Sequence, residues 1–223
     1  MGKLAIVLGG TGLVGRSLVD QLVDSDHISK IITLTRNKAE HASLKVNNHI
    51  INFDKMEDHE SLFRGDLFFS CLGTTLKEAG SVEARHQVDL IYQYKAASLA
   101  SGHEGCHYLL VSASGANSKS KNSYLQMKGE LEEKVQALPF KRISLFQPSL
   151  LIGKRDTLRV GEAVASRILP FFCKIPGVNR YRPIRGDQVA EKMVHVSLHD
   201  GPKLEWFQLD ELFINSESGD KKS

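Results

Sequence analysis

Residues Leu4–Asp20 read LAIVLGGTGLVGRSLVD and contain a strand, a glycine turn and the start of a helix in direct succession. Ala5–Leu8 is a short apolar run with β-branched residues, as found in the buried strands of parallel sheets. From Leu13 to Leu22, apolar residues recur at the spacing of an amphipathic helix. The glycines between these two segments therefore lie where a strand gives way to a helix.

The glycine turn predicts a phosphate-binding site. Gly9, Gly12 and Gly15 have the spacing G-x-x-G-x-x-G, which a tight turn without a ligand would also give. A helix N-terminus presents unpaired N–H groups and a partial positive charge, and glycine lets a pyrophosphate approach both. The strand before the turn and the helix after it favour a dinucleotide. We expect cofactor contacts from the turn, made by Gly9, Thr11, Gly12, Leu13, Val14 and Gly15.

Strands and helices alternate along the rest of the chain, which predicts an α/β fold with a doubly wound parallel sheet, the Rossmann fold. Further predicted strands are Lys30–Thr35, Asn48–Phe53, Asp66–Leu72, His107–Ser112 and Arg142–Gln147. The predicted helices include Ser81–Ser101, 123–138, 161–169 and Val189–Leu198. We expect a single domain over residues 1–223, in which residues of about 152–215 form a small C-terminal substrate lobe with an apolar lid at Leu169–Ile175.

The end of the second predicted strand favours NADPH over NADH. In dinucleotide folds an Asp or Glu at this point binds the 2′-hydroxyl of NAD, and this chain has Arg36 and Asn37 there instead. A guanidinium at this point can pair with the 2′-phosphate of NADP, although a plain surface arginine is the alternative. Asp54, after the third predicted strand, is expected near the adenine amino group or else is a simple turn residue.

Tyr124 and Lys128 lie four residues apart in the helical segment SYLQMKGELEEKVQAL, so both side chains share one helix face. A nearby ammonium favours the ionised form of a tyrosine, which suits a residue that exchanges protons. Carbonyl reduction needs such a residue, because hydride arrives at carbon while a proton goes to oxygen. Most pairs at this spacing are a core tyrosine and a solvated lysine, but this pair follows a strand ending in serines. We expect Ser112, or else Ser114, to hydrogen-bond the carbonyl oxygen.

Four stretches together resemble the atypical short-chain dehydrogenases of the Tat-interacting-protein type: the glycine turn, CLGTT at 71–75, YLLVSASGAN at 108–117 and YLQMKGELE at 124–132. RPIRGDQVA at 182–190 is a looser match to extended short-chain dehydrogenases. The resemblance implies an NADPH-binding Rossmann fold with Tyr124 as general acid/base and Lys128 as its partner and ribose anchor. It also implies cofactor contacts after the fourth and sixth strands, from Leu72, Gly73, Thr74 and Leu151.

The chain departs from this resemblance in two features, the serine position and Asp89. The reductases that it matches place a serine about thirteen residues before the tyrosine, whereas Ser112 lies twelve residues before Tyr124 and Ser114 ten. Many relatives have an asparagine in the fourth helix where this chain has Asp89, which puts a water relay through that position in doubt. Arg159 can reach the cofactor phosphates or an acidic substrate, but a solvated arginine is an equal alternative.

Composition places limits on partners and compartment. Apolar residues make up 41% of the chain and charged residues 25%, as in soluble globular proteins. A net charge of +3 with scattered basic residues does not predict nucleic-acid binding. No apolar run approaches the roughly 20 residues that span a bilayer, so we expect no membrane insertion and a cytoplasmic protein. The three cysteines, Cys71, Cys106 and Cys173, lack the spacing of zinc ligands and predict reduced thiols without a metal site.

These features together predict an NADPH-dependent oxidoreductase that acts on a small-molecule carbonyl substrate, as a monomer or a homodimer. The alternative is a regulator that binds NADPH and signals its state to a protein partner without significant turnover. The short lobe after the sixth strand leaves room for both.

Overall fold

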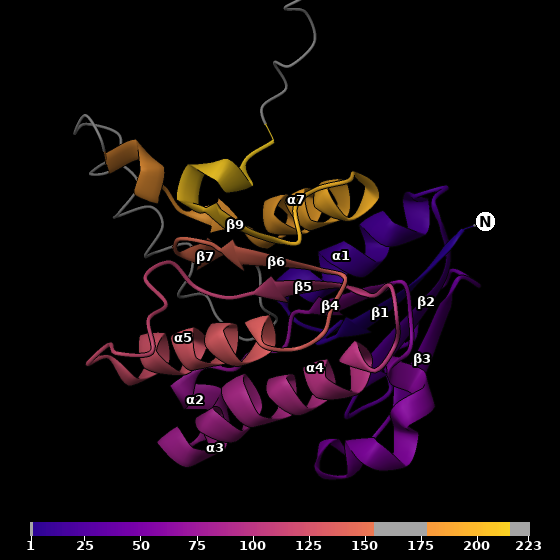
Figure 1. Cartoon of the computed structure of the whole chain (residues 1–223), viewed down its shortest axis with the longest axis horizontal. Helices are drawn as coiled ribbons and strands as arrows, with labels where there is room; N and C mark the ends of the chain where they lie inside the picture. Colours follow the sequence, from indigo (N-terminus) through magenta and orange to yellow (C-terminus); the bar gives the residue numbers. More distant parts are fainter. Residues whose placement is uncertain (1, 154–177, 215–223) are drawn as a thin grey trace, which may run out of the picture.

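The computed structural model of the chain describes residues 2–153 and 178–214 (Figure 1). Its centre is a seven-stranded sheet in the order β3-β2-β1-β4-β5-β6-β9, and every neighbouring pair is parallel. The strands are β1 (Lys3–Leu8), β2 (Ile28–Thr35), β3 (Val46–Ile50), β4 (Leu67–Ser70), β5 (His107–Val111), β6 (Arg142–Gln147) and β9 (Leu204–Gln208). The predicted doubly wound parallel sheet is confirmed.

Helices cover both faces of the sheet. Figure 1 shows α1 (Leu13–Asp24) and α7 (Gly186–Leu198) side by side on one face, with α4 (Gln93–Ser101) and α5 (Ser123–Gln136) on the other. Each face has its own core of buried side chains, because successive strand residues point to opposite sides. In β1, for example, Ile6 packs towards α4 and α5, whereas Val7 packs towards α1 and α7. Strands buried on both faces explain the continuous apolar runs in the sequence.

Shorter helical pieces surround the second face. They are the 3-10 segment η1 (Phe53–Phe63), α2 (Leu76–Ala79), α3 (Val82–His86) and the π-helical turn η2 (Gln87–Tyr92), which joins α3 to α4. The predicted helix Ser81–Ser101 is therefore present with a wider turn inside it. Such turns insert one extra residue and are frequent at functional sites. The remaining pieces are two 3-10 turns, η3 (Val178–Tyr181) and η4 (Leu209–Leu212), and a two-stranded parallel ribbon of β7 (Leu151–Ile152) and β8 (Ile184–Arg185).

The third predicted strand, Asn48–Phe53, is placed two to three residues too late. β3 ends at Ile50, because the side chain of Asn52 accepts a hydrogen bond from the Asp54 N–H and caps η1. Phe53 then begins η1 and is buried in the core. A polar residue with strong capping preference thus overrides the apolar pattern that extended the predicted strand.

The structure describes only residues 152–153 and 178–214 of the predicted substrate lobe. In its described part, α7 packs along α1 and β9 pairs with β6 from Ile143↔Leu204 to Gln147↔Gln208. These two elements complete the sheet and its cover, and β9 is not among the strands predicted from the sequence. The predicted helix over 161–169, the predicted lid at Leu169–Ile175 and Cys173 lie outside the described residues, so a lobe formed there stays a prediction.

A buried polar chain ties β5, β6 and β9 together at the start of the strands. The His107 ring lies 2.7 Å from the Ser144 hydroxyl, which donates to Glu205 at 2.6 Å. Arg142 Nε also donates to that carboxylate, at 2.9 Å. Burial lowers the pKa of His107 to about 3, helped by the positive charges of Arg142 and Lys3. The imidazole is therefore held neutral in the folded protein.

This histidine predicts a loss of stability in acid. In the unfolded chain the imidazole takes up its proton near pH 6.5, whereas folded His107 does so only near pH 3. Its contribution is therefore full above pH 6.5 and is lost as the pH falls towards 3, at up to about 1.4 kcal/mol per pH unit. Urea unfolding at pH 7 and pH 5 should show a smaller loss in His107→Gln than in the wild type. The exposed His27→Gln is the control, and equal losses in all three proteins would contradict the expectation.

Candidate functional site

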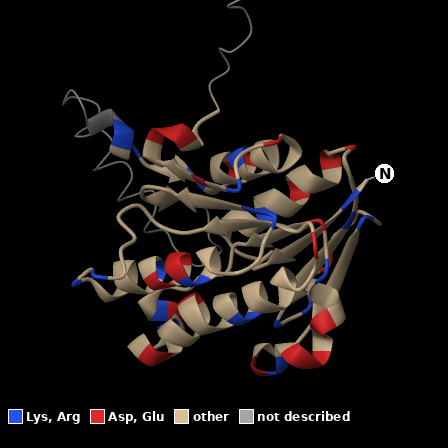
Figure 2. Cartoon of the chain, viewed as in Figure 1, with Lys and Arg blue, Asp and Glu red and all other residues tan. Residues whose placement is uncertain are grey.

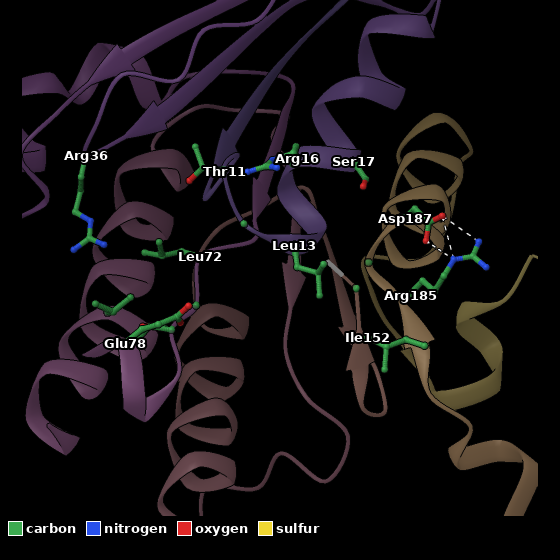
Figure 3. Close-up of a pocket in the computed structure, with 16 residues that line it drawn as sticks. Thr11, Leu13, Arg16, Ser17, Arg36, Leu72, Glu78, Ile152, Arg185 and Asp187 are labelled. Carbon is green, nitrogen blue, oxygen red and sulfur yellow. Dashed lines mark hydrogen bonds and ion pairs between the residues drawn. The ribbon is translucent and has the colours of Figure 1, made fainter. Parts of the chain in front are cut away.

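A cleft of about 700 Å³ lies at the carboxyl ends of the strands, where the chain order reverses between β1 and β4 (Figure 3). This is the usual ligand position of an open α/β sheet. Figure 3 shows Arg36 and Glu78 on one side of the cleft, Arg185 and Asp187 on the other, and Leu13 between them. A second pocket of about 610 Å³ adjoins it and shares residues of the glycine turn and of the segment after β4.

The glycine turn has a geometry that only glycine allows at two points. Gly9 has a φ of +84°, and a Cβ there would lie 2.6 Å from the Leu72 nitrogen. A Cβ at Gly15 would collide with the carbonyl of Gly9, so α1 starts in direct contact with the turn. At Gly12, by contrast, a Cβ would meet nothing closer than 3.4 Å. The turn is thus tight on its inner side and open at Gly12, which lines the cleft.

The start of α1 fits a bound pyrophosphate. Gly12 is its N-cap and supplies no side-chain hydrogen bond to the first turn. The backbone N–H groups of that turn are consequently without a capping side chain, at the positive end of the helix dipole. Because Gly12 and Leu13 line both the cleft and the adjoining pocket, the donors lie where the two halves of a dinucleotide would meet.

The adenosine side of the cleft contains two arginines. Arg36, immediately after β2, lines the cleft as the sequence predicts, and Arg16 in the first turn of α1 lines it too. Asn37 and Asp54 do not line it in the described structure, and binding through them stays a prediction. Asp54 accepts a 2.6 Å hydrogen bond from the Tyr92 hydroxyl, which raises the pKa of that tyrosine.

The adjoining pocket brings together the residues expected to react. Tyr124 and Lys128 of α5 line it with Ser112 and Ser114, from the end of β5 and the segment after it. The Lys128 ammonium is buried and donates to the Val111 carbonyl at 3.4 Å. Leu151, which the resemblance implies as a cofactor contact, also lines this pocket, together with Ser149 and Leu150.

The two serines differ in exposure. Ser112 is 3% exposed and faces α5, near the Glu132 carboxyl. Its Oγ has no hydrogen-bond partner of ordinary geometry among the described residues, although it is close enough to lower the pKa of Glu132, which burial raises. Ser114 is half-buried and follows the strand end, where its N–H donates to Pro148 O at 2.9 Å. Ser114 is therefore the more accessible of the two hydroxyl groups.

Asp89 stands behind Lys128 on the π-helical turn η2 and is 1% exposed. One carboxylate oxygen lies 3.7 Å from the Lys128 ammonium, and the other lies 3.6 Å from Arg85 Nε. The second oxygen also accepts the Thr74 N–H at 3.4 Å. This carboxylate links the cofactor-facing segment after β4 to the reactive end of α5.

Several lining residues escaped the sequence analysis. Arg16 and Arg85 carry no local signal, since an arginine on a helix face is ordinarily solvated. Gly186 packs against Leu13, because a Cβ built at Gly186 would lie only 2.6 Å from the Leu13 carbonyl oxygen. It belongs to the RPIRGDQVA stretch, which is only a loose match to extended short-chain dehydrogenases. Arg159 lies outside the described residues.

Cys106 is buried in the core, and Cys71 is half-buried after β4. Burial raises the pKa of the Cys71 thiol to about 12, and Lys128 opposes this only in part. Burial likewise raises the pKa of Cys106 to about 12. Both are free thiols. Neither is ionised near neutral pH, so neither acts as a nucleophile beside the cofactor cleft.

The parallel sheet, the glycine turn and the cleft at the strand ends are those of the Rossmann fold. No family model matches the chain. Protein HTATIP2 of Rattus norvegicus is 37% identical over 179 residues, which cover 78% of this chain and 72% of that protein. Protein FMP52-1 of Scheffersomyces stipitis is 32% identical over 219 residues, covering 93% and 96%. The chain belongs to the family of HTATIP2, the Tat-interacting protein, and FMP52, as the resemblance predicted.

Solved structures share the fold. MoeE5 in complex with UDP-glucuronic acid and NAD superposes with a TM-score of 0.69 at 11% identity, covering 92% of this chain and 75% of MoeE5. A short chain dehydrogenase family protein from Francisella tularensis gives a TM-score of 0.60 at 12% identity and covers 92% of this chain and 96% of that one. At these identities the likeness is in the fold alone.

The cytoplasmic location expected from the sequence is contradicted by the fungal relatives, which are named as mitochondrial proteins. That expectation rested on the lack of a long apolar run and of a secretory signal, and neither observation bears on mitochondria.

No helix in ranges 2–153 and 178–214 is long and apolar enough to cross a membrane. Figure 2 shows basic and acidic residues interspersed over the elements, and the lack of a nucleic-acid partner stays a prediction.

The turn predicts opposite effects for two glycine substitutions. Gly12→Val should leave the free energy of unfolding within about 1 kcal/mol of the wild type, because its Cβ has room. The same change should weaken dinucleotide binding at least tenfold, because the side chain extends into the cleft. Gly15→Ala should instead destabilise the fold by about 1 to 3 kcal/mol through its clash with Gly9. Urea unfolding and NADPH titration separate the two effects, and unchanged NADPH binding in Gly12→Val would show that the cradle is placed wrongly.

Proposed function

We propose that the protein is an NADPH-dependent oxidoreductase that reduces a carbonyl group of a small molecule. The observation that carries this proposal is the meeting of Tyr124, Lys128 and Ser114 in a pocket continuous with the cleft at the start of α1. A proton donor, a cation and a hydroxyl group thus lie beside the place where the nicotinamide half of a dinucleotide would extend.

The residues divide into two sets along the bound dinucleotide. Arg36, together with Arg16 from the start of α1, would hold the adenosine end and its 2′-phosphate, and the α1 N-terminus would hold the pyrophosphate. Leu72, Gly73 and Thr74 line both the cleft and the pocket and would follow the cofactor between them. Lys128 would hold the nicotinamide ribose hydroxyls.

When bound, the reduced nicotinamide supplies a hydride to the carbonyl carbon. Tyr124 would give its phenolic proton to the carbonyl oxygen, so that the hydride on carbon and the proton on oxygen together convert the carbonyl into an alcohol. The phenolate then recovers a proton from water. Ser114 donates a hydrogen bond to the same oxygen and fixes its position. Its half-buried hydroxyl suits this role better than that of Ser112, which points towards Glu132.

Tyr124→Phe tests the proton transfer. It removes only the hydroxyl group, so NADPH affinity should change by less than about threefold, while kcat falls by about 100-fold or more. The measurement is NADPH oxidation with aldehydes, ketones and quinones, together with an NADPH titration. A normal rate in the variant would refute the assignment. Tight NADPH binding by a wild type that reduces none of these compounds would favour the alternative of a nucleotide sensor.

Arg36→Ala tests the choice of cofactor. Loss of a charge-assisted contact with the 2′-phosphate should weaken NADPH binding by about 10- to 100-fold and leave NADH binding nearly unchanged. Lys30→Ala is the matched control, because Lys30 is an exposed cation on the same strand, far from the cleft end. Equal losses for both nucleotides in Arg36→Ala would remove the basis for preferring NADPH.

A further inference from the structure

Arg85, in the last turn of α3, lies beside the residue expected to donate the proton. Its guanidinium carbon is 4.3 Å from the centroid of the Tyr124 ring. The side chain is 18% exposed and lines the same pocket as Tyr124 and Lys128. Nothing in the roles assigned above requires a second cation at this point.

Arg85 shares its carboxylate partner with a second cation. Among the described lining residues of the pocket, the charged ones are Arg85, Lys128 and Asp89. Asp89 is 1% exposed and lies 3.6 Å from Arg85 and 3.7 Å from Lys128. Lys128 also interacts with the Glu132 carboxyl, whose pKa burial raises. An anionic ligand beside Arg85 would complete the pairing of its charge in this largely buried place, where an uncompensated charge is costly.

The contacts of Arg85 leave hydrogen-bonding capacity at its guanidinium. Its Nε is buried without a hydrogen-bond partner in the described structure, since 3.6 Å to Asp89 is too long for one. A guanidinium presents paired N–H donors that match the two oxygens of a carboxylate. The adjoining wall is apolar, with Val111, Leu125 and Leu150, and suits a short hydrocarbon chain.

We propose that the substrate is an oxo acid, whose carboxylate is held by Arg85 while Tyr124 protonates its carbonyl oxygen. This inference rests on the proposed reductase function and names its substrate class. The contact between Arg85 and the Tyr124 ring places the carboxylate site and the proton donor within the span of one small molecule. Lys128 is not assigned to the substrate carboxylate, because its ammonium already contacts Asp89 and the Val111 carbonyl.

Binding is measured first, because it needs no turnover. Pyruvate, acetoacetate and levulinate, each with its methyl ester, are titrated calorimetrically into the complex with NADP⁺. The wild type should bind at least one acid tenfold or more tightly than its neutral ester. Arg85→Gln should abolish this preference by weakening the acid by about the same factor and the ester less than threefold. Arg85→Lys keeps the positive charge but loses the paired N–H donors of the guanidinium, so its preference for the acid should lie between those of the wild type and Arg85→Gln.

Turnover with NADPH is measured on the same pairs. The acid-to-ester ratio of kcat/KM should fall in Arg85→Gln by about the factor seen in binding. Arg64→Gln is the matched control, because Arg64 is an exposed arginine paired with Glu60 away from the pocket. An equal loss for acid and ester in Arg85→Gln would overturn the proposal and make Arg85 a structural partner of Asp89.

The wild-type comparison keeps the proposal testable if the variants fail to fold. A wild type that binds no acid more tightly than its ester overturns it without any substitution. Selective binding of an acid without reduction of any compound supports the anion site and refutes the reductase function. Reduction of the esters in preference to the acids supports the reductase function and refutes the anion site.

Discussion

The contact between Gly15 and the backbone of Gly9 is the constraint on which the cleft depends. It brings the first turn of α1 against the end of β1, so the helix begins at the carboxyl edge of the sheet. Leu13, in that turn, then serves as the support for the opposite wall, since both Gly153 and Gly186 pack against it. The β7–β8 ribbon and the start of α7 are therefore located by the same contact that places the phosphate-binding donors.

The arrangement of the pocket also depends on one buried carboxylate, that of Asp89. Asp89 has two cations and the Thr74 N–H within reach, and each belongs to a different element. Removing it would leave Lys128 and Arg85 facing each other without compensation in a buried place, which is far more costly than losing an exposed ion pair. Asp89, on a π-helical turn, thus connects Lys128 of α5 to the segment after β4.

Local signals were enough to predict six of the seven strands and part of the lining of the cleft and its adjoining pocket. Strand periodicity, glycine spacing and helix-face spacing depend only on residues that are close together in the sequence. For this reason the sequence predicts the strand that contains Ala5, the glycine turn, and the shared helix face of Tyr124 and Lys128. β9 could not be predicted, since an edge strand with exposed Trp206 has no continuous apolar run. Arg85 could not either, because its position depends on the π-helical turn and on where α5 lies, and neither is a property of neighbouring residues. The sequence alone could not decide between Ser112 and Ser114, because the choice depends on the side of the strand to which each side chain points.

The π-helical turn η2 also bears on how this fold can diversify. Relative to an α-helix, one extra residue turns everything before it by roughly 100° about the helix axis. Gain or loss of a single residue there changes which α3 side chains face the pocket, while α4 keeps its buried alanines against the sheet. The packing that the domain needs in order to fold and the surface that meets the substrate are consequently free to evolve at different rates along one continuous helical segment.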